Sequence, residues 1–485
     1  MEKKDLQPAS VFHYFEEVCK VPRPSKKEEK IRQYLVDFAA AHGLACKTDE
    51  AGNVLVSKAA SAGMENRKKV ILQSHMDMVC EKNGGVSHDF ETDPIETYID
   101  GEWLRAKGTT LGADNGIGVA AELAVLAADD IEHGPIECLF TVDEETGLTG
   151  AFALKEGFMD GDILINLDSE DEGELFIGCA GGAGTTAEFS CPMVKAPEGW
   201  FFFRVAVKGL TGGHSGDDIN KNRANANKLL NRYLTSMMQR YGMRLCEIGG
   251  GNLHNAIPRE ASAVCAVPME YKEAVRVDLN VYLAEVEEEY SVTEPNLAME
   301  LESETPRKEV MEPEAMRRFL LAVYAVHNGV YMMSQDIPGL VETSSNLASV
   351  KQRDGKIVIV TSQRSSILSS RKDMSRMVSA AFELGGATCV TADGYPGWKP
   401  DPHSEILGIA VESYRRLFGV EPKVKAIHAG LECGLFLEKY PSLDMVSFGP
   451  TLRGVHSPDE RMLIPTVDKF WRHLLDVLRH IPVKE

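Results

Sequence analysis

The chain has 485 residues, of which 44% are hydrophobic and 26% are charged, which is typical of a globular protein with two or three domains. Its net charge of -21 argues against nucleic acid and anionic membranes as partners, because both attract basic faces. We find no apolar run of about 18 residues and no secretory signal pattern. The ten cysteines lack metal or disulfide-framework spacing, which indicates reduced thiols and a cytoplasmic location.

Helical and strand-like patterns alternate in the first third of the chain. The spacing of apolar residues predicts helices over 8–21, 26–42 and 116–128. Short apolar runs predict strands over 69–73, 136–141 and 162–166. This alternation predicts an α/β domain with a mixed, mainly parallel sheet and helices on both faces.

The middle of the chain has a different pattern. Two successive sets of strands and helices, one from residue 201 and one from residue 312, predict an inserted, doubled α+β domain with an antiparallel sheet. The segment 395–401 (YPGWKPD) has the punctuation of a linker, and further helices and strands follow it. We therefore expect a catalytic domain in two parts, 1–185 and 401–485, around an inserted domain, 186–400.

Five metal-seeking side chains lie at strand ends or in the loops after them. They are His75, Asp114, Glu145, Asp168 and His456. Ligands of open α/β sheets bind at the carboxyl edge of the strands, so the first four are expected to meet there. Two imidazoles and three carboxylates can hold two divalent ions if one carboxylate bridges them, and we assign that position to Asp114. The last segment must then rejoin the first domain to supply His456.

Two further acids fit this hypothesis. Asp77 is two residues from His75 in an extended segment, so it can accept the second ring N–H of that histidine. Glu144 and Glu145 are adjacent, which is costly without a cation. Glu145 can bind metal while Glu144 removes a proton from the attacking water. His214, in the turn GLTGGHSG, is a candidate for stabilising the oxyanion.

These residues lie in motifs that resemble a known family. HMDMV, TTLGADNGIG, DEETG, NLDSE, GGHSG, NAIPREA, HAGLECGLF and GPTLRGVHSPDE are close to the motifs of cytosolic aminoacylhistidine dipeptidases, also called cytosol non-specific dipeptidases. These enzymes belong to the co-catalytic zinc peptidases, with the aminoacylases and acetylornithine deacetylase. The resemblance covers nearly the whole chain and implies hydrolysis of unblocked dipeptides, Xaa-His and broader.

The resemblance also implies roles for individual residues. His75 and Asp168 would bind one metal, Glu145 and His456 the other, and Asp114 would bridge them. Asp77 and Glu144 would be the orienting carboxylate and the base, with His214 as the oxyanion donor. The insert would be a lid of doubled ferredoxin-like type that also carries homodimer contacts.

Substrate contacts are implied at Asn255, Arg364, Gly430 and Glu432, with Arg364 or Asn255 at the substrate carboxylate. An arginine fork suits a carboxylate. The metals would be zinc, with manganese and cobalt as alternatives, because imidazole and carboxylate suit all three.

Three other hypotheses stay open. An N-acyl amino acid deacylase would share all five ligands, and a non-catalytic metal-binding protein would share the scaffold. The long doubled insert favours the dipeptidase, and the presence of every ligand and the base favours an enzyme. A cysteine hydrolase using Cys433 and His428 is the weakest of the three, because this pair lacks a strand–helix elbow.

Overall fold

The computed structural model describes residues 3–484, which form two compact units. The first unit comprises the chain up to Gly178, Pro400–Ala426 and the chain from Glu432 onward, and the second comprises Cys179–Lys399 and Ile427–Leu431. The first division lies upstream of the expected boundary after residue 185, because the strand that begins at Gly181 belongs to the sheet of the second unit. Among residues 3–484, no helix combines the length and apolarity needed to cross a bilayer.

The first unit alternates strands and helices. Its helices are η1 (Lys3–Asp5), α1 (Ala9–Cys19), α2 (Glu29–Ala41), α3 (Ala113–Ala127), α4 (Glu144–Gly147), α5 (Thr149–Ala153), α10 (Glu405–Phe418), α11 (Cys433–Lys439) and α12 (Ile464–Arg479). Its strands are β1 (Ala45–Thr48), β2 (Val54–Lys58), β3 (Val70–His75), β4 (Thr97–Asp100), β5 (Trp103–Ala106), β6 (Ile136–Thr141), β7 (Ile163–Asn166), β8 (Glu174–Cys179), β22 (Lys423–Ile427), β23 (Asp444–Ser447), β24 (Leu452–Arg453) and β25 (Arg461–Leu463).

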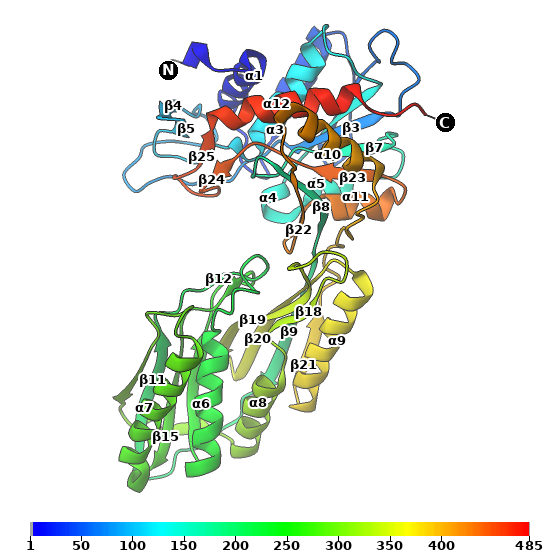
Figure 1. The fold of residues 1–485 in the computed structure, drawn as a ribbon. Helices are drawn as coiled ribbons and strands as arrows, with labels where there is room; N and C mark the ends of the chain where they lie inside the picture. Colours follow the sequence, from blue (N-terminus) through cyan, green and yellow to red (C-terminus); the bar gives the residue numbers. More distant parts are fainter. Residues whose placement is uncertain (1–2, 485) are drawn as a thin grey trace. The chain divides into compact units, whose positions relative to one another are not determined.

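The central sheet of this unit has the order β1-β2-β6-β3-β7-β23-β8-β22. Strands β6, β3, β7 and β23 are parallel to one another, and β1, β2 and β8 join antiparallel at the flanks. Every residue of β3, β6 and β7 is buried, so both faces of the sheet are covered. Helix α3 packs on β3 and α10 on β23, with α1 against α3 and α12 against α10 (Figure 1). The predicted mainly parallel sheet is confirmed.

A second, four-stranded sheet of this unit, β24-β25-β5-β4, was not predicted. Its strands are short, and two of them come from the last part of the chain. The hairpin β24–β25 pairs Leu452 with Met462 and Arg453 with Arg461. His456 therefore lies in a hairpin loop that is anchored at both ends.

The second unit is built on an antiparallel sheet. Its helices are α6 (Ala226–Tyr241), η2 (Met269–Tyr271), α7 (Lys272–Glu289), α8 (Pro313–Ala325) and α9 (Leu368–Leu384). Its strands are β9 (Gly181–Ser190), β10 (Met193–Lys195), β11 (Trp200–Lys208), β12 (Gly213–His214), β13 (Arg244–Gly250), β14 (Ala256–Ile257), β15 (Ala261–Pro268), β16 (Ala298–Ser303), β17 (Glu309–Met311), β18 (Gly329–Met333), β19 (Val341–Arg353), β20 (Lys356–Ser365) and β21 (Thr388–Thr391).

The main sheet of this unit has two halves with the same topology. The halves follow the chain orders β11-α6-β13-β15-α7-β16 and β9-α8-β19-β20-α9-β21, each a ferredoxin-like βαββαβ set. The halves join where β13 pairs with β19. The doubled ferredoxin-like prediction is confirmed, but the expectation of two successive sets is wrong. The first set is nested inside the second, because β9 precedes it in the chain while α8 follows it.

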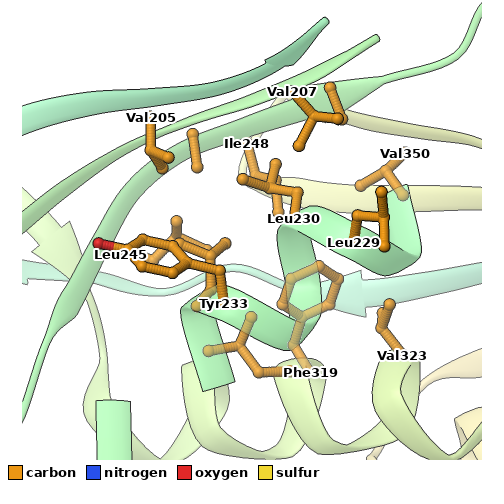
Figure 2. Close-up of a cluster of buried hydrophobic side chains, with 14 of the residues drawn as sticks. Val205, Val207, Leu229, Leu230, Tyr233, Leu245, Ile248, Phe319, Val323 and Val350 are labelled. Carbon is orange, nitrogen blue, oxygen red and sulfur yellow. The ribbon is translucent and has the colours of Figure 1, made fainter. Parts of the chain in front are cut away.

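One hydrophobic core holds the doubled unit together. Helices α6, α7, α8 and α9 lie side by side over one face of the sheet (Figure 1). Along β11, Phe203, Val205 and Val207 are buried in this core, whereas Arg204 and Lys208 point to solvent, as the period of two requires. Figure 2 shows side chains of α6 and α8 meeting those of the strands. Burial of each large apolar side chain contributes about 1.5–3 kcal/mol.

Candidate metal centre and substrate-contact residues

The strand order of the first unit explains why distant residues meet. His75 is the last residue of β3, and Asp168 follows β7, which is parallel to β3. Glu145 lies on α4, directly after β6, the other parallel neighbour of β3. The carboxyl ends of parallel strands meet at one edge, so these side chains converge there. Asp114, in the first turn of α3, and His456, in the β24–β25 loop, complete the group.

The five predicted ligand residues are close together. His75 Nε2 lies 3.1 Å from Asp114 Oδ1 and 3.3 Å from Asp168 Oδ1. His456 Nε2 lies 3.1 Å from Asp114 Oδ2 and 3.1 Å from Glu145 Oε2. Asp114 thus presents a different oxygen to each imidazole, and each imidazole has a second carboxylate of its own. Two cation positions that share one carboxylate would have this geometry.

The carboxylates set the electrostatics of the two imidazoles. Burial opposes the charged form of His75, but Asp168 and Asp114 outweigh it and raise its pKa well above the usual value. Hydrogen bonds to Asp114 and Glu145 raise the pKa of His456 to about 11. The cluster therefore attracts positive charge strongly, whether as protons or as metal ions.

The donor set fits metal ions. His75, Asp114 and Glu145 each offer a ligand atom, and these atoms lie within 4.8 Å of one another. Glu145 Oε1 is buried and has no hydrogen-bond partner among the described residues. A buried carboxylate oxygen without a partner is costly. A divalent cation would satisfy this oxygen, and imidazole with carboxylate suits zinc and its neighbours.

A second acidic cluster at this edge is satisfied by the protein itself. Glu28, Asp77 and Asp143 also have oxygens within 4.8 Å of one another. However, Glu28 accepts the backbone N–H of Asp143 at 3.0 Å, and Asp143 accepts the hydroxyls of Thr146 and Thr149. These bonds occupy the carboxylates and tie Asp143, the residue before α4, to α4 and α5. This cluster is therefore a structural network.

Asp77 connects His75 to the loop that carries the two adjacent glutamates. Its Oδ1 lies 3.3 Å from His75 Nδ1. Its carboxylate also accepts the backbone N–H groups of Glu144 at 3.1 Å and Glu145 at 3.3 Å, and the hydroxyl of Ser25 at 2.7 Å. Burial, followed by neighbouring acids, raises the pKa of Glu144 well above its usual value. A carboxylate with a raised pKa takes up a proton more readily than an ordinary one, as a general base must.

Asn115 was missed in the sequence analysis, although it follows Asp114 in the ADNG motif. Its side-chain NH₂ donates to the Leu167 carbonyl at 3.0 Å and to the Asp168 carboxylate. It therefore fixes Asp168 relative to the start of α3.

Glu432, predicted as a substrate contact, lies beside the metal cluster in the first unit. Its Oε2 accepts hydrogen bonds from Gln73 Nε2 and Thr141 Oγ1, both at 2.7 Å. Gln73 is two residues before His75 on β3, so both side chains are on the same face of the sheet. Glu432 Oε1 is buried without a partner among the described residues, and burial raises the pKa of Glu432 to about 7.

The other predicted contacts belong to the second unit. His214 Nε2 lies 3.3 Å from Arg364 Nη2, and its Nδ1 lies 3.2 Å from the Asp217 backbone nitrogen. Arg364 is 6% exposed and donates to the hydroxyl of Tyr395 at 3.1 Å. Arg364 also donates to the Ser215 hydroxyl at 3.4 Å. It forms no ion pair in the part of the chain that the structure describes. Arg364 is thus a buried cation surrounded by neutral or imidazole groups.

Asn255 and Gly430 lie near the same group. The Asn255 carbonyl accepts the Ser215 N–H at 2.8 Å, next to the pairing of β12 with β14. A Cβ at Gly430 would come within 2.8 Å of the Tyr395 ring, so glycine permits that contact. Tyr395 was missed because its segment has the composition of a linker.

His428, the histidine of the cysteine-hydrolase hypothesis, contacts a serine hydroxyl in the structure. His428 is buried, and its Nε2 lies 2.8 Å from Ser344 Oγ. Burial, followed by the positive charge of Arg364, lowers the pKa of His428 to about 3. Burial also makes this histidine part of the polar interior of the second unit.

Comparisons with known proteins show which proteins this chain is similar to in sequence and fold. The chain is 44% identical, over 483 residues and 100% of both chains, to the cytosol non-specific dipeptidase of Escherichia coli strain K12. Its fold matches the crystal structure of aminoacylhistidine dipeptidase from Vibrio alginolyticus with a TM-score of 0.93 and 46% identity, covering 100% of this chain and 99% of that one. A tripeptidase from Staphylococcus aureus shares the fold, with a TM-score of 0.58 at 16% identity, covering 98% and 99% of the two chains.

The family assignment follows from the length of these matches. The model of the peptidase family M20/M25/M40 matches residues 71–480, a range that includes all five predicted metal ligands and every predicted substrate contact. The resemblance recognised in the sequence motifs is confirmed. The chain belongs to peptidase family M20/M25/M40.

Proposed function

We propose that the protein is a dinuclear metallo-dipeptidase that hydrolyses unblocked dipeptides. The observation that carries the proposal is the position of Asp114 between His75 and His456, each of which has its own further carboxylate. The dipeptidase names of the full-length relatives support the substrate class. The name of the Escherichia coli relative also supports a cytosolic location.

The proposed ligands are those predicted from the sequence. His75 and Asp168 would hold one ion and Glu145 and His456 the other, with Asp114 shared between them. Zinc is the proposed metal. Two such ions supply Lewis acidity toward the scissile carbonyl and toward the attacking water.

Glu144 is the proposed base. Its carboxylate would take a proton from the attacking water and give it to the leaving amine. Its backbone N–H donates to Asp77, which fixes the start of α4 relative to His75. The raised pKa of Glu144 supports this proton-carrying role.

The second unit would supply the substrate contacts and the oxyanion donor. Arg364 is a buried cation without an anionic partner, which is unfavourable unless an anion arrives. We assign it to the carboxylate of the dipeptide, with Asn255 and Gly430 beside it. His214, next to Arg364, is the proposed donor to the oxyanion, and the resemblance suggests that the unit also forms a homodimer.

Glu432 is proposed to bind the α-ammonium group of the substrate. Gln73 and Thr141 already satisfy its Oε2, whereas Oε1 is left to accept a donor. A carboxylate at this position would favour free amino termini over N-acyl groups. It would thus separate a dipeptidase from a deacylase.

A substrate panel tests the proposal. The metal-free protein is reloaded with Zn²⁺, Mn²⁺ or Co²⁺, and its metal content and its hydrolysis of dipeptides and N-acetyl amino acids are measured. We expect two ions per chain and hydrolysis of dipeptides, Xaa-His included. Faster hydrolysis of N-acetyl amino acids would identify a deacylase, and binding of no more than one ion would remove the basis of the dinuclear mechanism.

A further inference from the structure

Both polar backbone groups of Gly112 are bound by buried side chains. Its N–H donates to Glu460 Oε2 at 2.8 Å, and its carbonyl accepts from Arg23 Nη2. Gly112 has a φ of +67°, and a Cβ there would lie 2.6 Å from Arg23 Nη2. Glycine is therefore required for both its conformation and this close approach. Gly112 immediately precedes α3, whose first turn carries Asp114.

Glu460 binds four successive backbone N–H groups. Its Oε2 accepts those of Leu111 and Gly112 at 2.7 and 2.8 Å, and its Oε1 accepts those of Ala113 and Asp114 at 2.8 and 3.2 Å. The side chain of Glu460 is 2% exposed. No helical carbonyl is available to N–H groups at the start of a helix, so this carboxylate replaces several missing partners at once.

The backbone next to Glu460 is also fixed, by strand pairing. Glu460 directly precedes β25, whose residue Arg461 pairs with Arg105 of β5 and with Arg453 of β24. His456 lies in the same hairpin loop. Glu460 therefore ties the loop that carries His456 to the segment that carries Asp114.

Arg23 connects the segment that carries Asp114 to the segment that carries His75. It is 2% exposed, and its Nη1 donates to the carbonyls of Asp77 at 2.7 Å and Met76 at 3.2 Å. These two residues directly follow His75. Arg23 therefore ties the end of β3 to the carbonyl of Gly112.

We infer that Arg23 and Glu460 are positioning residues that set the spacing of the two metal sites. Neither residue is among the proposed ligands. Together they connect the segments of His75, Asp114 and His456 through one shared residue, Gly112. The inference rests on the proposed dinuclear site. It adds that the bridging carboxylate is held in place before metal binds.

The physical reason is preorganisation. Asp114 must present one oxygen to each imidazole, so a shift of its backbone changes the geometry at both metals. Partners outside the ligand shell affect metal affinity by about 10–100-fold when they are removed. Glu460→Gln replaces one acceptor oxygen with an NH₂ group that faces backbone donors. This substitution should therefore displace the segment and weaken metal binding.

The test measures metal binding directly. The metal-free wild type, Glu460→Gln and Arg23→Lys are titrated with Zn²⁺ against a chelating dye, and the visible spectra of their Co²⁺ forms are recorded. We expect two ions in the wild type and an affinity lowered by about 10–100-fold in both variants, with altered Co²⁺ spectra. Lysine keeps the charge of Arg23, but its single ammonium group does not span the carbonyls of Met76, Asp77 and Gly112 as a guanidinium does.

Asp444→Asn is the matched control. Asp444 is at the other end of the parallel strands and caps α10, accepting the Ser404 hydroxyl at 2.5 Å and the Ile406 N–H at 3.0 Å. This control should lower the thermal stability of the metal-free protein without changing its Zn²⁺ affinity. If Glu460→Gln and Arg23→Lys behave in the same way, both residues are merely structural and the inference is wrong.

Glu460→Asp covers the case in which the glutamine variant does not fold. It keeps the charge but shortens the reach to the four N–H groups, so we expect lower Zn²⁺ affinity and faster amide hydrogen exchange over residues 111–114 in the metal-free protein. Wild-type values for both would overturn the inference. A wild type that binds fewer than two ions would instead overturn the proposed function.

Discussion

The carboxylate of Asp77 lies 3.3 Å from Nδ1 of His75, on the side of the ring opposite the nitrogen that faces Asp114 and Asp168. A carboxylate beside Nδ1 favours the tautomer that carries its proton there, which leaves the Nε2 lone pair for a metal. The same carboxylate accepts the N–H groups of Glu144 and Glu145. Asp77 therefore orients a proposed ligand and the loop of the proposed base together.

Asp77→Asn should lower the affinity for Zn²⁺ by about 10–100-fold, because a neutral amide removes the negative charge that lies 3.3 Å from Nδ1 of His75. Titration against a chelating dye measures this change. Ser25→Ala is the control, since it removes one donor to Asp77 without touching His75, and its effect should be smaller. Equal affinities for Asp77→Asn and the wild type would show that the ring does not depend on this carboxylate.

Glu144→Gln should leave two ions bound and lower kcat by at least about 10²-fold, because the side chain can no longer carry a proton. Metal content by elemental analysis and turnover of a dipeptide are measured on the same sample. Turnover close to that of the wild type would assign the base to another group. Loss of metal would place Glu144 among the ligands instead.

Arg364→Met should raise KM more than it lowers kcat, because it removes a contact to a part of the dipeptide that does not react. A charged hydrogen bond of about 1.5–3 kcal/mol corresponds to a roughly 10–150-fold change in KM. The sharper measurement compares a dipeptide with its C-terminal amide. The wild type should strongly prefer the free acid.

In Arg364→Met this preference should disappear. Tyr395→Phe is the matched control, since it removes only the hydroxyl that accepts from Arg364, and it should keep most of the preference. If Arg364→Met discriminates acid from amide as well as the wild type does, the substrate carboxylate binds elsewhere.

The metal-seeking residues at strand ends could be predicted from the sequence, because the carboxyl ends of parallel strands all lie at one edge of the sheet. His75, Glu145 and Asp168 each come at or soon after a buried parallel strand, and a short apolar run is readable locally. Local sequence patterns could not predict that one ferredoxin-like set is nested inside the other. Strand β9 pairs with β20 across a long sequence separation, and no local pattern encodes that partner.

The residues that support the site were also missed, for a related reason. Glu460 and Arg23 bind backbone groups, and any residue type supplies a backbone N–H or carbonyl. The sequence therefore holds no complementary side chain to point to the partner. Tyr395 is a further case, because its Pro/Gly-rich surroundings indicate a linker while its hydroxyl accepts from Arg364.

His214→Ala should lower kcat by about 10²–10³-fold with unchanged metal content, as expected for the loss of one oxyanion donor. His254, which lies in an exposed loop of the same unit, is the control, and His254→Ala should keep its turnover. If His214→Ala retains the wild-type kcat, His214 has only a structural role in β12 and the oxyanion is stabilised by another group.

Mixing two inactive chains then shows which subunit the histidine serves. His214→Ala keeps the proposed base and metal ligands, and Glu144→Gln keeps His214. If the protein is a dimer in which each histidine serves the neighbouring chain, mixed dimers contain one complete site, and activity returns when the two variants are refolded together. If the histidine serves its own chain, both sites of a mixed dimer stay incomplete and no activity returns. Light scattering on the same samples measures whether dimers form. Absence of activity shows that the histidine acts within its own chain only if mixed dimers are present.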